Sequence, residues 1–143
     1  MITAVLDTNV LASGFVRPEP PPGRILAAWQ AGTFLLVVSH HILAELEHTF
    51  EELYFATRLS SAQRRANLAL VREEAIIAPL KVRVQDVATH PEDDLILATA
   101  VSARVDYLVT GDKKLQALKT YRGVRIVSPQ GFLEILARQE NPL

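Results

Sequence analysis

Four carboxylates stand beside the ends of predicted strands, where they could do chemistry together. Asp7 follows the apolar run MITAVL, and Asp112 lies two residues beyond the run VDYLVT. Asp93 opens a helical segment, and Glu45 lies on the helix predicted after the second strand. In open α/β sheets, sites form at the carboxyl ends of the strands. We therefore expect these four side chains to converge on one edge of the sheet.

A convergent set of carboxylates needs positive charge. Carboxylates at close range either hold protons or bind hard cations. Carboxylate and water oxygens suit Mg²⁺ or Mn²⁺. Two such ions about 4 Å apart can activate a water and stabilise the leaving oxygen of a phosphodiester. The acids therefore favour the hypothesis of metal-dependent phosphodiester hydrolysis.

Each acid also has a purely structural explanation. Asp7 can cap the turn into the next helix, and Asp112 can cap the helix that follows it. Asp93 and Asp94 stand in a first helical turn, where the helix dipole favours acids. Glu45 lies on the flank of its helix's apolar face and could simply be solvated. The placement of all four at strand–helix junctions is what favours a common site.

The elements that must position these acids alternate along the chain. Ser39 and Ser60 are expected to start helices, and proline-rich residues 17–23 to form a loop. The predicted strands cover residues 3–6, 33–39, 75–84, 105–110 and 124–128, and the predicted helices residues 9–16, 24–31, 40–54, 61–75, 91–103, 113–120 and 129–138. This alternation predicts an α/β fold, a three-layer α/β/α sandwich with a central, mainly parallel sheet. We expect one domain over residues 1–143.

Composition restricts the classes of function. The chain has 143 residues, 49% of them hydrophobic, so it can bury a sizeable core. The absence of cysteine excludes a disulfide framework, a thiolate metal site and a thiol nucleophile. A net charge of −1 gives no overall basic footprint for nucleic acid. With no signal-peptide pattern and no long apolar run, we expect a soluble, cytoplasmic protein.

Four segments carry a resemblance to a known family. They are VLDTNVL, VVSHHILAELEHTF, DDLILATA and DYLVTGDKKL, which occur in this order and together span nearly the whole chain. In these motifs the chain resembles the PIN-domain ribonucleases, most closely the VapC-like toxins of prokaryotic toxin–antitoxin systems. The resemblance implies an acidic site that binds Mg²⁺ or Mn²⁺ and hydrolyses RNA. It also implies a homodimer and a cognate antitoxin as partner.

The resemblance also assigns residues. It carries over four acids as catalytic and metal-binding: Asp7, Glu45, Asp93 and Asp112. It gives Asn9 and Thr110 a supporting role, orienting carboxylates and bound water. Asp94 is a further candidate for support, because either neighbour of the pair Asp93–Asp94 could reach a metal.

Other interpretations remain open. A catalytically silent PIN-type module that binds RNA or protein would be marked by a degraded acidic set, and this sequence keeps the set. A phosphoryl-transfer domain with Asp7 as nucleophile is disfavoured, because the second aspartate expected two positions on is Asn9. Lys113 and Lys114 could contact RNA phosphates, although a solvated helix start explains them better.

Overall fold

A six-stranded sheet forms the centre of the protein, whose computed structural model describes residues 1–140. The strands lie in the order β3-β2-β1-β4-β6-β5. All neighbours are parallel except β5, which runs antiparallel to β6. The strands are β1 (Thr3–Leu6), β2 (Leu35–Val38), β3 (Ile76–Ile77), β4 (Tyr107–Val109), β5 (Thr120–Tyr121) and β6 (Val124–Val127).

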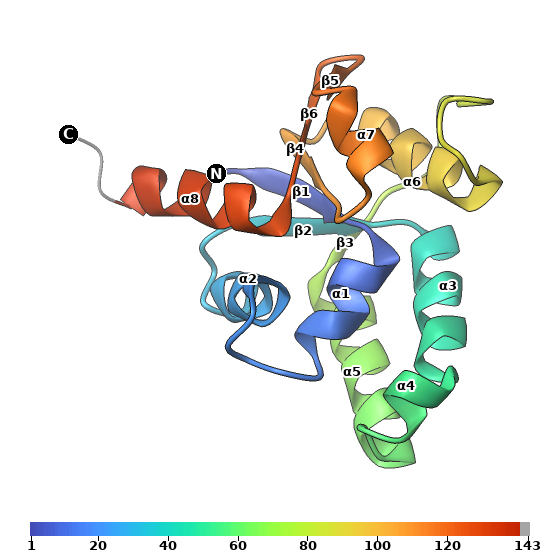
Figure 1. Ribbon diagram of the computed structural model, residues 1–143, viewed down its shortest axis with the longest axis vertical. Coiled ribbons are helices and arrows are strands. Elements are labelled where there is room, and N and C mark those ends of the chain that lie inside the picture. Colours follow the sequence, from blue (N-terminus) through green and yellow to red (C-terminus); the bar gives the residue numbers. More distant parts are fainter. Residues whose placement is uncertain (141–143) are drawn as a thin grey trace.

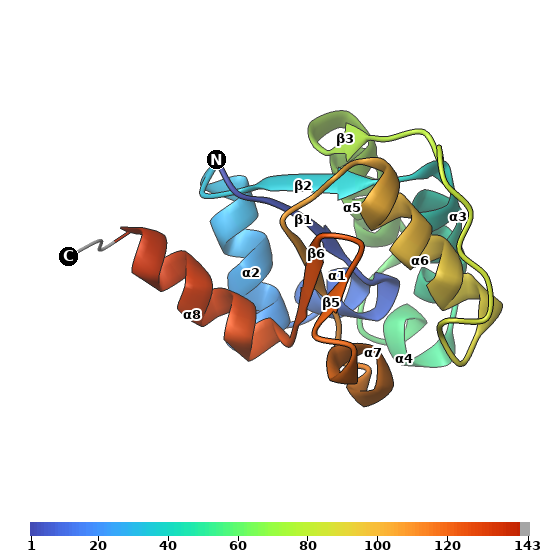
Figure 2. The same cartoon turned by 90° about the horizontal axis from the view of Figure 1, so that it is seen from above.

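Helices flank the sheet on both sides. Figure 1 shows α1, α2 and α5 on one side and α6 and α7 on the other, and Figure 2 shows α8 lying beside α2. The helices are α1 (Thr8–Gly14), α2 (Pro21–Gln30), α3 (His40–Phe50), α4 (Leu53–Ala56), α5 (Ser61–Glu74), α6 (Pro91–Ser102), α7 (Lys113–Ala117) and α8 (Pro129–Glu140). The predicted fold class, a mainly parallel sheet between helical layers, is confirmed.

Burial explains why the central strands read as continuous apolar runs. Ala4, Val5 and Leu6 of β1 are fully buried, as are Leu108 and Val109 of β4. Strands covered on both faces need apolar side chains at every position rather than at alternate ones. The carboxyl ends of these two neighbouring strands therefore lie in the core, and the residues that follow them, Asp7 and Thr110, are attached to this core.

The predicted strand over residues 75–84 is wrong beyond its first residues. The strand covers only Ile76 and Ile77, the Ala78 N–H still donates to the Val38 carbonyl of β2 at 2.8 Å, and an irregular segment then leads to α6. Backbone N–H groups that a longer strand would have used instead find a side chain of α6. Lys81 and Val82 donate to the Ser102 hydroxyl at 2.8 and 3.2 Å. The sequence also places Pro79 here, which cannot donate to a ladder.

Three predicted helices also differ from the structure. The helix predicted over residues 40–54 ends at Phe50, and Leu53–Ala56 forms the separate helix α4. The proline-rich loop ends earlier than expected, because α2 begins at Pro21 with prolines in its first turn, where their missing N–H is not needed. The helix predicted over residues 113–120 ends at Ala117, and Thr120–Tyr121 forms β5 instead. Lys119 and Arg122 take positive φ values of 62° and 47°, which turn the chain on either side of this short strand.

Among residues 1–140, none of the helices combines the length and the apolar character that crossing a membrane requires. The single domain over residues 1–143 stays a prediction, and its last three residues lie outside the described part of the chain.

Candidate active site

Asp7 stands where β1 ends and α1 begins. Its backbone N–H donates to the Val109 carbonyl at 2.9 Å, which continues the β1–β4 pairing by one residue. Its Oδ1 accepts from the Val10 N–H at 2.9 Å and so caps α1. Its Oδ2 accepts from the Thr110 hydroxyl. Helix capping therefore explains the position of Oδ1, whereas Oδ2 is bonded to Thr110, the residue that follows β4.

Thr110 joins two of the predicted acids. Its side chain is fully buried, and its hydroxyl donates to Asp7 while accepting from the Asp112 N–H at 3.0 Å. Asp112 in turn caps α7, with Oδ1 accepting from the Lys114 N–H at 2.8 Å. The buried Thr110 hydroxyl thus links the Asp7 carboxylate to the backbone N–H of Asp112 through two hydrogen bonds.

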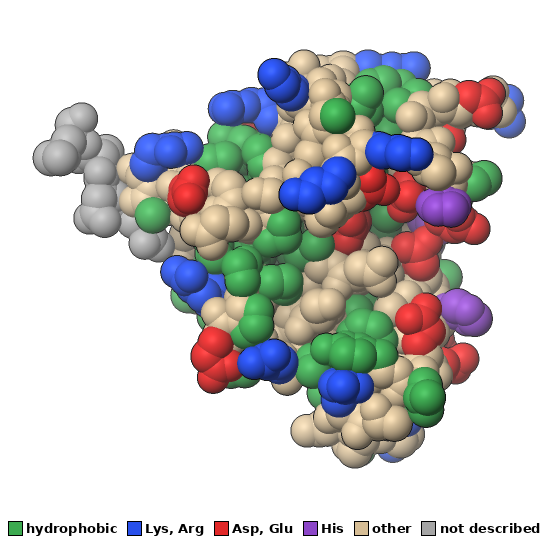
Figure 3. Space-filling model, viewed as in Figure 1, with side chains coloured by type: hydrophobic (Ala, Val, Ile, Leu, Met, Phe, Trp, Pro, Cys, Tyr) green, Lys and Arg blue, Asp and Glu red, His purple; other side chains and the backbone are tan. Residues whose placement is uncertain are grey.

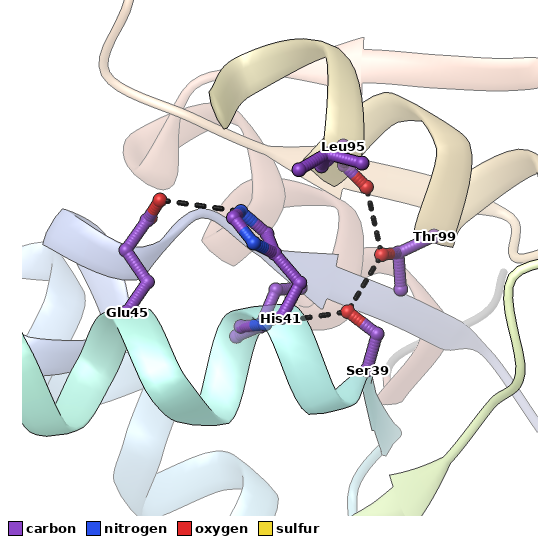
Figure 4. Close-up of polar contacts among 6 residues, drawn as sticks. Ser39, His41, Glu45, Leu95 and Thr99 are labelled. Carbon is purple, nitrogen blue, oxygen red and sulfur yellow. Dashed lines mark hydrogen bonds and ion pairs between the residues drawn. The ribbon is translucent and has the colours of Figure 1, made fainter. Parts of the chain in front are cut away.

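Glu45 is placed by α3, whose start is tied to α6. The Thr99 hydroxyl lies 2.8 Å from both the Ser39 hydroxyl and the Leu95 carbonyl oxygen (Figure 4). Both hydroxyl-bearing side chains are buried. Because a hydroxyl carries one hydrogen, Ser39 can donate to Thr99 while Thr99 donates to Leu95. This link fixes the helix of Glu45 relative to the helix of Asp93.

His41 is a neighbour of Glu45 that the sequence interpretation left out. Its Nε2 lies 3.3 Å from Glu45 Oε2, and Figure 4 shows the two side chains pointing toward each other. This nitrogen is buried and has no hydrogen-bond partner of good geometry within the described residues. The spacing of four residues on one helix is the signal that could have found the pair.

The adjacent residues Asp93 and Asp94 face different surroundings. Asp93 lines the cleft described below. Asp94 is only 7% exposed and lies apart from that cleft, where it accepts the backbone N–H groups of Asp86, Val87 and Ala88 at 3.0, 3.2 and 2.7 Å. The sequence did not decide whether Asp93 or Asp94 could join the other acids. In the structure, Asp93 lines the cleft with them and Asp94 does not.

A cleft of about 660 Å³ gathers the predicted acids. Figure 3 shows acidic side chains in a hollow between α7 on one side and α1 and α3 on the other. The polar and charged side chains that line the cleft are Asp7, Asn9, Ser13, Glu45, His48, Thr49, Glu52, His90, Glu92, Asp93 and Asp112. Glu52 and Glu92 were not predicted, and nothing in their local sequence separates them from solvated glutamates.

Burial and neighbouring negative charges raise the pKa values of two carboxyl groups in the cleft. Burial raises the pKa of Asp7 above its ordinary value, and the negative charge of Glu45 adds to this, while the hydrogen bonds from Thr110 and Val10 oppose it. Burial likewise raises the pKa of Asp93, followed by repulsion from Asp7, Asp112 and Glu45. Asp93 therefore lies within electrostatic reach of the other three acids.

The donor chemistry of the cleft fits a hard divalent cation. Its acids offer carboxylate oxygens with no thiolate, the set that suits Mg²⁺ or Mn²⁺. Within residues 1–140, no three carboxylate or imidazole groups yet stand close enough to hold an ion. Several carboxylate oxygens are engaged within the protein, because Asp7 and Asp112 cap helices and Glu45 Oε2 lies 3.3 Å from His41 Nε2.

Comparison with known proteins identifies the family. A model of the PIN domain matches residues 3–114, so the chain belongs to the PIN domain family. No curated protein matches the sequence. Two solved structures share the fold, each over 89% of this chain and 98% of theirs. One is VapBC2 from Rickettsia felis bound to a DNA fragment from their promoter, at 15% identity and a TM-score of 0.62. The other is FitAcB from Neisseria gonorrhoeae, at 18% identity and a TM-score of 0.53.

Proposed function

We propose that this protein is a metal-dependent endoribonuclease that hydrolyses RNA phosphodiester bonds. The observation that carries the proposal is the convergence of Asp7, Glu45, Asp93 and Asp112 on one cleft, although they come from four separate segments. Capping explains some of these acids singly, but it gives no reason for all four to share a cleft. Membership of the PIN domain family supports the same chemistry.

The four carboxylates have the chemistry to hold Mg²⁺ or Mn²⁺. When bound, such an ion supplies Lewis-acid activation of water and neutralises charge at the phosphodiester. The chain's own residues prepare the site. Thr110 fixes the direction of one Asp7 oxygen, and His41 lies against one Glu45 oxygen. Asn9 lines the same cleft and adds a neutral amide beside the acids.

Cleavage of single-stranded RNA in the presence of Mg²⁺ or Mn²⁺ tests the proposal. Asp7→Asn should lose activity by at least about 100-fold, since removing a charged ligand costs several kcal/mol of transition-state stabilisation. Asp86→Asn is the matched control, because it removes one carboxylate at an exposed position outside the cleft. Equal activity in wild type and Asp7→Asn would place the activity elsewhere and refute the assignment.

A metal titration separates the nuclease from a catalytically silent binding module. A ligand that binds only the folded state raises stability by about 2.7 kcal/mol at 100 times its Kd. Mn²⁺ should therefore raise the melting temperature of the wild type and of Asp86→Asn, and raise that of Asp7→Asn much less. RNA binding without any effect of millimolar Mn²⁺ would favour the silent module.

We further propose that the protein is the toxin component of a toxin–antitoxin pair, with an antitoxin and a second copy of itself as partners. The VapC-like motifs and the fold shared with a chain of the VapBC2 structure support this. Co-expression with a small neighbouring open reading frame should yield a stable complex, and growth arrest by the protein alone should be relieved by it. Growth unaffected by expression of the wild type would contradict the toxin role.

A further inference from the structure

One segment of this chain carries several positive charges and no acid. Five of its fifteen lysine and arginine residues lie within positions 113–125, and no acid occurs between Asp112 and Glu134. The other ten cations are distributed among all sixteen acids. We call the five residues the basic stripe: Lys113, Lys114, Lys119, Arg122 and Arg125.

The stripe is available to a ligand. All five residues are exposed. The two ion pairs of the described chain are His41–Glu45 and Arg72–Glu47, so no charge of the stripe is neutralised by an acid there. Figure 3 shows Lys and Arg side chains gathered over the part of the molecule that holds α7, β5 and β6, above the acidic hollow. Asp106 lines the same pocket as Arg125 but forms no ion pair with it.

The stripe starts at the rim of the candidate active site. Gly111 and Asp112 line the cleft, and Lys113 follows them directly at the start of α7. From α7 the chain enters the hairpin of β5 and β6 at the edge of the sheet. Arg125 pairs with Tyr107 at the opposite end of the parallel strands. The stripe therefore runs from the carboxyl edge of the sheet, where the acids lie, to its amino edge.

Aromatic rings accompany the cations. The Arg122 guanidinium lies 5.1 Å from the centre of the Tyr121 ring, and the Arg125 guanidinium 5.5 Å from that of Tyr107. Tyr107 is buried in the core, so the partly exposed Tyr121 is the ring that a base can reach. Proteins that bind single-stranded nucleic acid combine a basic track for the backbone with rings and arginines on which unpaired bases stack. A duplex offers no free base faces to such rings.

We propose that the basic stripe binds the phosphate backbone of single-stranded RNA that extends out of the acidic cleft. This inference rests on the proposed function, since it assigns a path to that function's substrate. It also supplies what the cleft lacks, because a cleft lined by acids repels a polyanion. The positive charge of the stripe attracts the strand to the rim of the cleft. At the part of the stripe away from the cleft, a base of the strand stacks on Tyr121 and Arg122.

Salt dependence of RNA binding tests the inference. Each phosphate contact on a single strand contributes about −0.7 to the slope of log K against log salt concentration. In an Asp7→Asn background, which keeps the RNA intact, the triple variant Lys113→Gln, Lys114→Gln, Lys119→Gln should make the slope shallower by about 2 and weaken binding at least tenfold. Fluorescence anisotropy of a labelled single-stranded RNA, titrated between about 50 and 200 mM salt, measures both quantities.

The matched control removes three exposed cations elsewhere, with Arg65→Gln, Lys81→Gln and Arg83→Gln. It changes the net charge equally, so it should leave the slope within about 0.5 of the parent. An unchanged slope in the stripe variant, an equal loss in the control, or tighter binding of duplex than of single strand would overturn the inference.

Cleavage measured on the same proteins, with the native Asp7 restored, separates the two proposals. If the stripe variant raises KM with little change in kcat, both hold. If the wild type does not cleave RNA but the stripe variant still loses RNA binding, the proposed function fails and the binding surface stands. If the wild type cleaves and the stripe variant has an unchanged KM, the binding surface fails and the nuclease stands.

Discussion

Replacing Thr110 with valine removes one hydroxyl and keeps the shape of the side chain. The hydroxyl is fully buried, donates to the Asp7 carboxylate and accepts from the Asp112 N–H. Valine can do neither. Because the change leaves no cavity, the loss of stability reports these two hydrogen bonds rather than packing.

The size of the effect follows from the two partners. A hydrogen bond to a charged group contributes about 1.5–3 kcal/mol and a neutral one about 1 kcal/mol. Thr110→Val should therefore lower the free energy of unfolding by about 3 kcal/mol. In an Asp7→Asn background the hydroxyl faces a neutral amide, so the same substitution should cost about 0.5–2 kcal/mol less.

Urea unfolding followed by circular dichroism, at about pH 8 with EDTA, gives the four free energies of this double-mutant cycle. The coupling energy should decline as the pH falls through the pKa of Asp7, because the strong bond belongs to the ionised carboxylate. Equal losses in the two backgrounds, within about 0.5 kcal/mol, would refute the idea that Thr110 positions the Asp7 charge.

Three further substitutions probe the cleft and its supports. Asp93 has a raised pKa, so its contribution to stability is full below its unfolded pKa and is lost as the pH rises through its folded pKa. Asp93→Asn should therefore stabilise the metal-free protein at neutral pH by about 0.5–1 kcal/mol in urea unfolding, a gain that disappears at low pH. Asp94→Ala leaves three backbone N–H groups without acceptors and should cost about 3 kcal/mol, with faster hydrogen exchange at residues 86–88. His41→Phe should weaken Mn²⁺ affinity about tenfold in calorimetry, and His41→Gln should restore part of it by returning a donor.

Local chemistry was sufficient to predict much of the fold. Apolar runs gave the central strands, because a strand covered on both faces has no polar positions to confuse the pattern. Ser39 and Ser60 gave the starts of α3 and α5, because their side chains meet backbone N–H groups only three residues away. Asp112 was recognised as a helix cap for the same reason. These features depend on neighbours in the sequence, which the sequence displays.

The parts that were not predicted depend on distant partners. The segment after Ile77 is not a strand because Ser102 and Asp94, both on α6, take up its backbone N–H groups. No local pattern of residues 78–90 shows that these acceptors will lie beside it. The pairing of Thr120 with Arg125 likewise formed a short strand that a helical pattern had concealed. The same limit applies to the site, where Asp93 and Asp94 look equivalent until the packing of α6 turns one to the cleft and the other to the loop.

The net charge of −1 conceals a separation of charge that the proposed reaction needs. Burial raises the pKa values of Asp7 and Asp93, and repulsion from neighbouring acids adds to this, so the acids that would hold a metal are unfavourable neighbours in its absence. The same acids repel an RNA strand. A protein that had these acids and no cluster of cations elsewhere would therefore bind a metal but bind RNA weakly. Placing acids at the carboxyl edge of the sheet and cations along α7, β5 and β6 resolves this conflict. In the proposed reaction, a bound metal would neutralise the cleft where the bond is cut, and the basic stripe would hold the strand where no metal is needed.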